Sequence, residues 1–362
     1  MNYATYFPDQ RHILPSGVIR RERLLPEGVV GEVEAQVGER VDLRDVVARG
    51  EAAARYVVLD AVQELRLKRP EALADLMLVE VGEPVEAGQV IAGKAKGRGR
   101  KLQSPIDGVI RHVGGGRVIV QELPEPVEAQ AGLSGQVVAV RERRGVVIEA
   151  SGAVLQGVWG NNRLSVGPLR IWPDSELDAI EIDEIALGYR GTIVVLRQPL
   201  RRAGLEIAEK VGIAGVVAPS MAPELVDMVR GFSLAVLLTE GFGARPMSAF
   251  VYSFLEGLSG RQATLDAVTP ERQSTNVPEL VVNLPRSTGQ RPPVLPETVT
   301  LRPGLNVRLT RGEYAGMTGQ IVHLPKTPYL LENGLRVLCA QVQFASGASA
   351  FVPLANLEVY GQ

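Results

Sequence analysis

The stretch that decides the fold is AGQVIAGKAKGRGRKLQSPIDGVI, residues 87–110. Two apolar segments, QVIA and GVI, stand on either side of a glycine-rich segment with five cations. The alternation of apolar and polar positions predicts half-buried strands that form a hairpin. If the hairpin is extended, alternation places Lys94, Lys96, Arg98 and Arg100 on one face, and Lys101 follows them directly.

A related pattern occurs earlier in the chain. Residues 28–50 and 76–94 share V-G-E-x-V, four further residues and then V-[IV]-A. Each copy alternates valine with polar residues and turns at a Gly-Glu pair, so each predicts a half-buried hairpin. Pairs of such hairpins build the flattened barrels of carrier-type domains.

Residues 76–122 resemble the biotinyl/lipoyl-like barrel-sandwich family in V-G-E-P-V-x-A-G-Q-V-I-A and in S-P-I-D-G-V-I. The resemblance implies a barrel-sandwich hybrid fold. In members that carry biotin or lipoate, a lysine lies at the hairpin apex, midway between the glycines that match Gly88 and Gly108. This sequence has Arg98 at the midpoint. Because arginine is not a substrate for this modification, we expect no covalent cofactor.

The five cations of the hairpin are candidates for contact with nucleic acid: Lys94, Lys96, Arg98, Arg100 and Lys101. Glycine lets the backbone approach a phosphate closely, and each neutralised phosphate adds salt-sensitive affinity. Two other roles stay open. In the first, the loop is a solvated segment that protects a strand edge from aggregation. In the second, the loop docks on the acidic stretch of residues 174–184 within the same chain.

A small α/β domain is predicted over residues 191–284. The segments TIVVL (192–196), IAGVVA (213–218) and SLAVLLTEGFG (233–243) are apolar and of strand length. Amphipathic or glycine-terminated helical segments follow each of them. Buried strands that alternate with helices are typical of a parallel sheet.

The third of these strands leads into the loop TEGFGARPMS, the position where α/β domains bind ligands. Its glycines permit unusual backbone angles, and the amides at the start of the next helix could receive an anion. An acidic residue in the loop opposes this, and the loop matches no phosphate-binding motif. The candidate ligand residues are Thr239, Glu240, Gly241, Gly243 and Arg245. The alternative is an ordinary turn between a strand and a helix.

The stretch PGLNVRLTRGEYAGMTGQIVHL, residues 303–324, resembles the KOW motif of ribosomal proteins and of transcription elongation factors of the NusG/Spt-five kind. The matching features are V-R-L-x-x-G, Y-A-G and T-G-Q-I, and later segments supply the strands of an SH3-like barrel. Family members use the loops around this motif to touch RNA, ribosomal RNA or polymerase. The resemblance implies these nucleic-acid candidates: Arg308, Arg311, Tyr314, Lys326 and Tyr329. Protein docking and a purely structural role stay open for this barrel.

No catalytic or metal-ligand set is visible in the sequence. The three histidines, His12, His112 and His323, lie in different segments, and none has a His or Cys at metal-ligand spacing. Cys339 lies in the apolar segment RVLCAQV and is interpreted as a small core residue. With 39 basic and 41 acidic residues the chain has no strong overall field, so attraction to nucleic acid has to be local.

The sequence therefore predicts a multidomain protein that is mainly β with one α/β domain. The expected parts are a barrel-sandwich domain over residues 1–125 with a helical insert at 51–76, an additional β-hairpin region packed on it over 126–190, the α/β domain over 191–284, a Pro-rich linker over 285–297 and a KOW-type, SH3-like barrel over 298–362.

The expected function is that of a non-enzymatic, cytoplasmic adaptor. Its partner would be RNA or an RNA-containing machine, a ribosome or a polymerase, bound through the KOW-type barrel and the basic hairpin. One alternative is a non-modified accessory subunit of an enzyme complex, with a protein partner. Another is a small-ligand binder that uses the α/β domain. No cofactor and no metal are expected, and no apolar run reaches the 18 residues that suggest membrane insertion.

Overall fold

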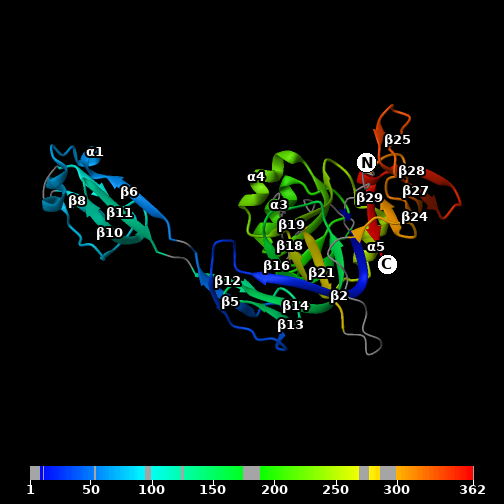
Figure 1. Cartoon of the computed structure of the whole chain (residues 1–362), viewed down its shortest axis with the longest axis horizontal. Coiled ribbons are helices and arrows are strands. Elements are labelled where there is room, and N and C mark those ends of the chain that lie inside the picture. The colour runs from blue at the N-terminus through cyan, green and yellow to red at the C-terminus, as the bar shows by residue number, and fades with distance from the viewer. Residues whose placement is uncertain are drawn as a thin grey trace, which may run out of the picture.

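The computed structural model describes residues 9–10, 12–52, 54–93, 99–123, 126–173, 188–268, 277–285 and 299–361. The protein is mainly β and contains several sheets. It consists of a large body and a small outer lobe, which we define as residues 54–123 (Figure 1). The outer lobe stands at one end of the elongated molecule, and the C-terminal strands lie at the other end (Figure 1).

The outer lobe contains an antiparallel sheet with strand order β6-β11-β10-β7 and a separate β8-β9 hairpin. Its strands are β6 (Tyr56–Asp60), β7 (Pro84–Val85), β8 (Val90–Gly93), β9 (Lys101–Gln103), β10 (Gly108–Gly114) and β11 (Arg117–Glu122). Helix α1 (Ala61–Leu65) is capped by the Asp60 carboxylate, and the 3-10 helix η1 (Pro70–Leu76) begins at its proline. The lobe has its own core, which includes Leu73, Ile91 and Ile110.

The body is built around one long antiparallel pair, β2 (His12–Leu24) and β14 (Gly145–Gln156). Strand β13 (Gly135–Arg141) pairs with β14 and with the short β4 (Arg40–Val41). A three-stranded sheet of order β12-β5-β3 leads toward the lobe. Its members are β3 (Gly31–Val33), β5 (Val46–Glu51) and β12 (Pro126–Gln130).

These strand pairings place the domain boundary differently from the prediction, in which residues 1–125 formed one barrel-sandwich domain. Strand β5 pairs with β12, and β2 pairs with β14, so residues 12–51 belong to the body and the lobe begins only at residue 54. The region after residue 126 likewise pairs with β2 and does not pack on the lobe as expected. The lobe is therefore an insertion between two paired strands of the body.

The two sequence copies adopt the same turn, one in the body and one in the lobe. Gly38 and Gly82 have φ values of 92° and 94°, in the left-handed region. The Gly38 N–H donates to the Val137 carbonyl at 2.8 Å, and the Gly82 N–H donates to the Ile110 carbonyl at 2.7 Å. In each turn the glutamate after the glycine accepts a backbone N–H at 2.8 Å through its side chain. The sequence repeat therefore corresponds to two turns with the same backbone conformation and the same hydrogen bonds.

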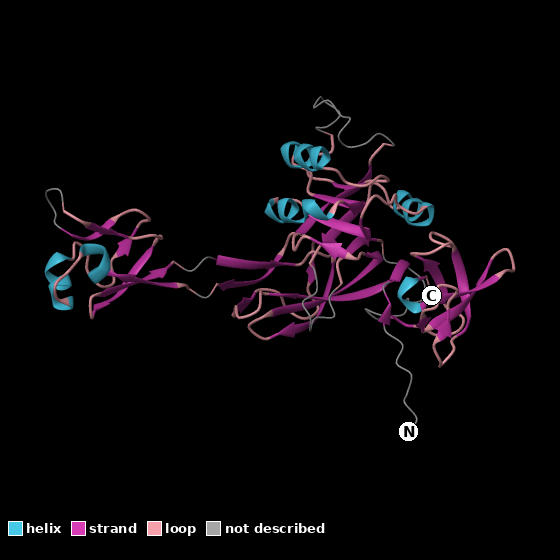
Figure 2. Ribbon diagram, turned by 90° about the horizontal axis from the view of Figure 1, so that it is seen from above, coloured by secondary structure: helices cyan, strands magenta, loops and turns pink. Residues whose placement is uncertain are grey.

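The α/β region has the parallel strands that the sequence predicts. They are β17 (Ile193–Val195), β18 (Gly215–Met221) and β19 (Ala235–Phe242). A fourth parallel strand, β16 (Leu164–Ile171), comes from the region that was predicted as an additional β-hairpin, and the short antiparallel β15 (Trp159–Gly160) lies at the edge. Helices α3 (Arg202–Val211) and α4 (Val226–Gly231) share a core with Val194, Val216 and Val236. Helix α5 (Ala249–Glu256) covers the residues of the opposite face. Helices therefore lie on both sides of this sheet (Figure 2).

Two antiparallel strands, β20 (Gln262–Asp266) and β21 (Glu279–Asn283), connect this parallel sheet to β14. The C-terminal module, which we define as residues 299–361, extends the same sheet because β29 pairs in parallel with β2. Its main strands are β23 (Asn306–Leu309), β24 (Thr318–His323), β27 (Cys339–Phe344), β28 (Ser349–Pro353) and β29 (Leu357–Tyr360). The module also contains short elements. Strand β22 (Val299–Thr300) pairs with β1 (Asp9–Gln10), and β25 (Tyr329–Leu330) forms a hairpin with β26 (Arg336–Val337). The 3-10 helix η4 (Leu354–Asn356) precedes β29.

Three further expectations concern single features. Cys339 is fully buried, which confirms its interpretation as a core residue. The Pro-rich linker of residues 285–297 falls, after its first residue, outside the described part of the chain. Within the described residues, no helix combines the length and the apolar character needed to cross a membrane.

Candidate functional site

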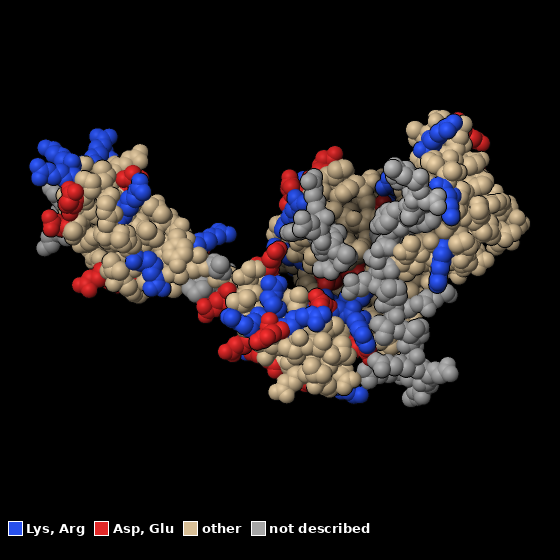
Figure 3. Space-filling view, viewed as in Figure 1, with Lys and Arg blue, Asp and Glu red and all other residues tan. Residues whose placement is uncertain are grey.

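Cations from two separate segments meet at the outer end of the lobe. Helix α1 contacts strand β9, and Arg100 Nη1 donates to the Glu64 carbonyl at 3.4 Å. This contact brings the segment that follows α1 beside the predicted basic hairpin. Together the two segments present five exposed cations. We call this group the basic tip: Arg66, Lys68, Arg69, Arg100 and Lys101. Figure 3 shows lysine and arginine side chains gathered at this end of the lobe.

The basic tip contains only part of the predicted hairpin site. Lys94, Lys96 and Arg98 lie outside the described residues, as does the acidic stretch proposed to dock on them. Arg66, Lys68 and Arg69 were not among the predicted residues. The run R-L-K-R was visible in the sequence, but its position beside the hairpin follows only from the fold. Glu64 in α1 and Glu71 in η1 lie close to these cations in the chain. The basic tip therefore has acidic neighbours, but the cations outnumber them.

Arg308, one of the predicted nucleic-acid residues, lies inside the protein instead. Its side chain is 1% exposed and binds two carboxylates. Nη1 lies 2.7 Å from Glu240 Oε1, and Nη2 lies 2.6 Å from Glu358 Oε2. Burial alone would lower the pKa of Arg308, but the charges of Glu358 and Glu240 outweigh this and raise it. The burial contradicts the expected contact between Arg308 and nucleic acid.

The remaining candidates of the C-terminal module lie at opposite ends of β24. Arg311 lies in the turn before β24, whereas Lys326 and Tyr329 follow its end. Six residues of strand span about 20 Å, so these side chains do not share one site. The turn before β24 also faces the α/β region, because Arg245 Nη1 donates to the Thr310 carbonyl at 3.3 Å. Tyr314 is half-buried, with its ring 5.2 Å from that of Phe344.

The other end of the C-terminal module is more open. Lys326 and Tyr329 are exposed there, and the Tyr329 ring stacks on Phe351 with 4.2 Å between centroids and an interplanar angle of 14°. Arg336, also exposed, lies opposite Leu330 in the β25-β26 hairpin. Phe351 and Arg336 were not predicted, because the strand pairing that brings them here cannot be inferred from the motif.

The predicted ligand loop of the α/β region is an interface between parts of the chain. Glu240 pairs with Arg308, and Arg245 donates to the C-terminal module. The Arg245 N–H also donates to Ser220 Oγ at 3.0 Å. Gly241 and Gly243 have φ values of 98° and 119°, as their predicted role in the turn requires. Thr239 is buried, and its Oγ1 has no hydrogen-bond partner. Arg308 therefore occupies the Glu240 carboxylate, whereas the Arg245 side chain is exposed, and the use of this loop for a ligand stays a prediction.

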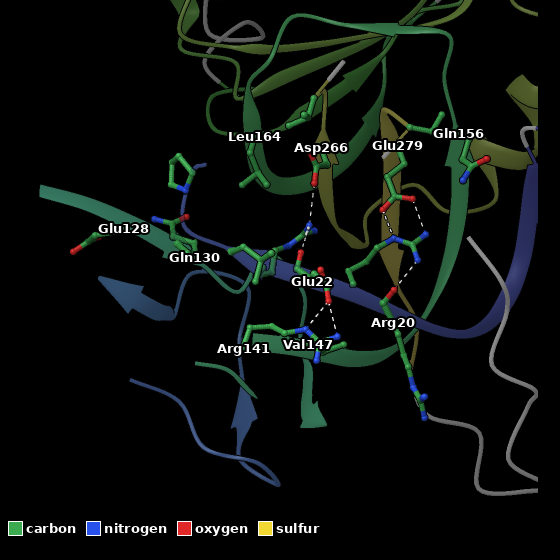
Figure 4. Close-up of a pocket in the computed structure, with 17 residues that line it drawn as sticks. Arg20, Glu22, Glu128, Gln130, Arg141, Val147, Gln156, Leu164, Asp266 and Glu279 are labelled. Atoms are coloured by element: carbon green, nitrogen blue, oxygen red, sulfur yellow. Dashed lines mark hydrogen bonds and ion pairs between the residues drawn. The ribbon is translucent and has the colours of Figure 1, made fainter. Parts of the chain in front are cut away.

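A cavity that the sequence did not predict lies in the body, with a volume of about 860 Å³. One wall is a row of side chains from four neighbouring strands: Leu164, Asp266, Glu279 and Gln156 (Figure 4). Each is directly opposite the next in the sheet register, so all four point to the same face. Strand β2 lines the cavity from the other side with the run of residues 20–24.

The cavity brings together ion pairs between residues far apart in the sequence. Arg21 holds Glu279 through two hydrogen bonds of 2.6 and 2.7 Å. Arg23 Nη1 contacts Asp266 Oδ2 at 3.0 Å. Burial raises the pKa of Asp266, and the charge of Glu279 adds to this, although Arg23 acts in the opposite direction. The cavity is thus a polar site within the body, unlike the exposed basic tip.

No metal centre is apparent in the described part of the chain, where no three or more His, Cys, Asp or Glu side chains form a group that could hold an ion. No protein-family model matches this chain, and no curated protein is similar to it in sequence.

Proposed function

We propose that the protein is a non-enzymatic, cytoplasmic adaptor that binds RNA, or an RNA-containing machine such as a ribosome or a polymerase. In this proposal the basic tip makes the main contact with the RNA backbone. The open end of the C-terminal module, with Lys326, Tyr329 and Arg336, makes a second contact.

The observation that carries the proposal is the convergence of five exposed cations at the basic tip. Lysine and arginine side chains that neutralise phosphates supply most of the sequence-independent affinity for nucleic acid. The lobe is inserted between β5 and β12 and extends away from the body, so its tip can reach a partner that the body does not touch (Figure 1).

The second contact rests on the exposed ring of Tyr329, which stacks on the half-buried Phe351. An exposed ring next to cations is a stacking platform for an unpaired base. The rings are already stacked in parallel, so a base placed on Tyr329 would extend an existing stack. This contact favours single-stranded RNA over a duplex, whose bases are not available for stacking.

The fold assignments from the sequence are part of the same proposal. The outer lobe is proposed to be a barrel-sandwich hybrid that lacks the modified lysine, and the C-terminal module an SH3-like barrel of the KOW type. The strand order β6-β11-β10-β7 with the β8-β9 hairpin, and the five main strands at residues 306–360, support these assignments.

One observation favours the alternative of an accessory subunit with a protein partner. Tyr56 and Val58 on β6, an edge strand of the lobe, are 61% and 55% exposed. Large apolar residues that stay exposed on a sheet edge are typical of a surface that another protein covers.

Fluorescence anisotropy with a labelled, unstructured RNA at low salt tests the proposal. We expect the triple substitution Arg66→Gln, Lys68→Gln and Arg69→Gln to weaken binding about tenfold or more, because three phosphate contacts are lost. The matched control neutralises three exposed cations of the body, Arg163, Arg170 and Lys210, and leaves binding unchanged within about twofold. If the intact protein does not bind RNA at low salt and instead purifies from its host with a stoichiometric protein partner, the accessory-subunit alternative holds.

A further inference from the structure

The outer lobe and the part of the body that carries it are two copies of one strand arrangement. In the lobe the pairing order is β7, β10, β11, β6, and in the body it is β4, β13, β14, β2. The register of β10 against β11 shifts between Ile110 and His112. The register of β13 against β14 shifts at the matching place, between Val137 and Ala139. The sequence repeat is therefore part of a larger structural repeat.

This repeat allows the same strand edge to be compared in two settings. Counted through the strand pairs from the shared register shift, Tyr56 of β6 corresponds to Arg20 of β2, and Val58 corresponds to Glu22. Within the described residues, β6 has a neighbouring strand on one side only, and so does this part of β2. Both strands are therefore open edges.

The edge of the lobe presents free backbone groups. The Glu122 N–H donates to the Arg55 carbonyl at 2.8 Å, so these two residues form a hydrogen-bonded pair of the antiparallel ladder. Hydrogen-bonded pairs alternate along such a ladder. The backbone N–H and C=O groups of Tyr56 and Val58 therefore point away from β11, toward the open side of β6.

The edge of the body is protected by charge. Arg20 forms an ion pair with Glu149 at 2.9 Å. Glu22 forms one with Arg141 at 2.7 Å. The outward carbonyl of Arg20 also accepts a hydrogen bond from Arg21 Nη1 at 2.8 Å. Charged side chains on an edge strand oppose pairing with another strand, so the body copy is unsuited to add one.

The lobe lacks this protection at the same positions. Tyr56 and Val58 replace the charged pair of the body, and their side chains are 61% and 55% exposed. An apolar edge whose backbone groups point outward is a template for one more strand. The comparison between the copies therefore indicates that the lobe edge pairs with a strand that lies outside the lobe.

Strand β6 is complementary to a second copy of itself. It follows Arg55 and ends at Asp60, both exposed, so an antiparallel arrangement places the cationic end of one copy beside the acidic end of the other. A parallel arrangement would place like charges together. With Val57 on the twofold axis, Tyr56 of each copy lies opposite Val58 of the other, an aromatic side chain beside a β-branched one. Each of these pairs exchanges both of its backbone hydrogen bonds.

We propose that the protein forms a symmetric dimer in which the β6 strands of two copies pair antiparallel about Val57, so that the two lobe sheets become one. Figure 3 shows that the lobe stands clear of the body, which leaves room for a second lobe. Helix α1 and the basic tip follow the Asp60 end of β6, so the dimer has one basic tip toward each end of the joined strands.

Sedimentation velocity of the full-length protein tests the proposal. Because a single strand pair makes a small interface, the measurement extends to about 200 µM protein, and we expect a dimer whose share grows with concentration. Val58→Lys gives the lobe edge a charge like that of the body and is expected to weaken dimerisation about tenfold or more. Val81→Lys is the matched control, in a turn of the same lobe with 60% exposure, and should change dimerisation by less than about twofold.

A wild type that stays monomeric at every concentration overturns the proposal, and another protein bound at β6 in its place would do the same. An equal effect of the two lysine substitutions also contradicts it. The RNA proposal does not depend on these results, because the basic tip is not part of β6.

A cysteine substitution tests the register. Val57 and its own copy would form a non-hydrogen-bonded pair with about 4.5 Å between Cα atoms, within the range of a disulfide. Val57→Cys should therefore form an intermolecular disulfide under mild oxidation. Val58 would be offset from its own copy by two residues, too far for a disulfide, so Val58→Cys should not crosslink. The native Cys339 is fully buried and gives no background. Equal crosslinking of both variants, or of neither, contradicts the proposed pairing.

Discussion

Arg308 of the C-terminal module and Glu240 of the α/β region form a buried ion pair, with 2.7 Å between Nη1 and Oε1. The same guanidinium holds Glu358 on β29, and its Nη1 also donates to Ser248 Oγ at 3.1 Å, at the cap of α5. One side chain therefore joins two parts of the body. The C-terminal module is fixed to the α/β region through this contact and through the pairing of β29 with β2.

Replacement of Arg308 by methionine is expected to lower the free energy of unfolding by about 3–5 kcal/mol, because the substitution leaves Glu240 and Glu358 as buried carboxylates without their cation. Urea unfolding measures the loss. The triple variant Arg308→Met, Glu240→Gln and Glu358→Gln removes all three charges and should recover much of the stability.

Arg311→Met is the control for that experiment. Arg311 is exposed and lies a few residues further along the chain, so its loss should change stability by less than about 0.5 kcal/mol. A similar loss for both arginines would contradict the interpretation of Arg308 as a buried connection.

Because the pKa of Asp266 is raised, the difference in stability between the wild type and Asp266→Asn should depend on pH. Burial raises this pKa above its ordinary value of 3.8, so the folded protein binds the proton more tightly than the unfolded chain does. The stability that this group contributes is complete below the unfolded pKa and is lost as the pH rises through the folded pKa. An asparagine side chain at this position would carry no charge and would not show this loss.

We therefore expect the free energy of unfolding of Asp266→Asn, relative to the wild type, to increase as the pH rises above about 4 and then to level off. Urea unfolding across a pH series measures the difference. Asp227→Asn, which removes an exposed carboxylate, is measured in parallel as the control for the loss of one negative charge. A difference that decreases with rising pH would show that the contact with Arg23 outweighs the burial of Asp266.

Cys339 should react slowly with iodoacetamide in the folded protein. The thiol is fully buried and burial raises its pKa, so little thiolate reaches the reagent. In denaturant the same cysteine should react fully, which intact-mass spectrometry can follow. Rapid labelling under native conditions would show that β27 opens readily to solvent.

The two copies of the turn should respond alike to substitution. Gly38 and Gly82 both have a left-handed backbone, and an added Cβ would meet nothing within 4 Å at either position. Gly38→Ala and Gly82→Ala should therefore each cost about 1–2 kcal/mol of backbone strain without a steric clash. Gly231→Ala, at a glycine with equal space and no left-handed angle, should not destabilise the protein. Unequal costs at the two turns would contradict their equivalence.

Local features of the fold could be predicted from the sequence. The apolar segment QVIA predicted the β8-β9 hairpin, and the apolar runs of the α/β region predicted its strands β17 and β18, because each depends on residues close together in the chain. The domain boundary could not be found in this way. It depends on the pairing of β5 with β12, which lie on either side of the inserted lobe.

The sites were harder to predict for the same reason. Arg21 and Glu279, which meet in the cavity, are 258 residues apart. The motif around Arg308 indicated an exposed loop, but the burial of its guanidinium depends on Glu240, 68 residues away. The hairpin cations at Arg100 and Lys101 are exposed as expected, whereas the cations that join them at the basic tip follow from the packing of α1 on β9.

The salt dependence of RNA binding tests the central proposal most directly. For single strands the slope of log K against log salt is about −0.7 per phosphate contact, so about five contacts give about −3.5 and roughly a hundredfold loss of affinity from about 50 to about 200 mM salt. The triple variant of Arg66, Lys68 and Arg69 loses three of these contacts, so the magnitude of its slope should fall by about 2.1. The same slope for the wild type and the variant, or binding that does not depend on salt, would contradict an RNA contact at the basic tip.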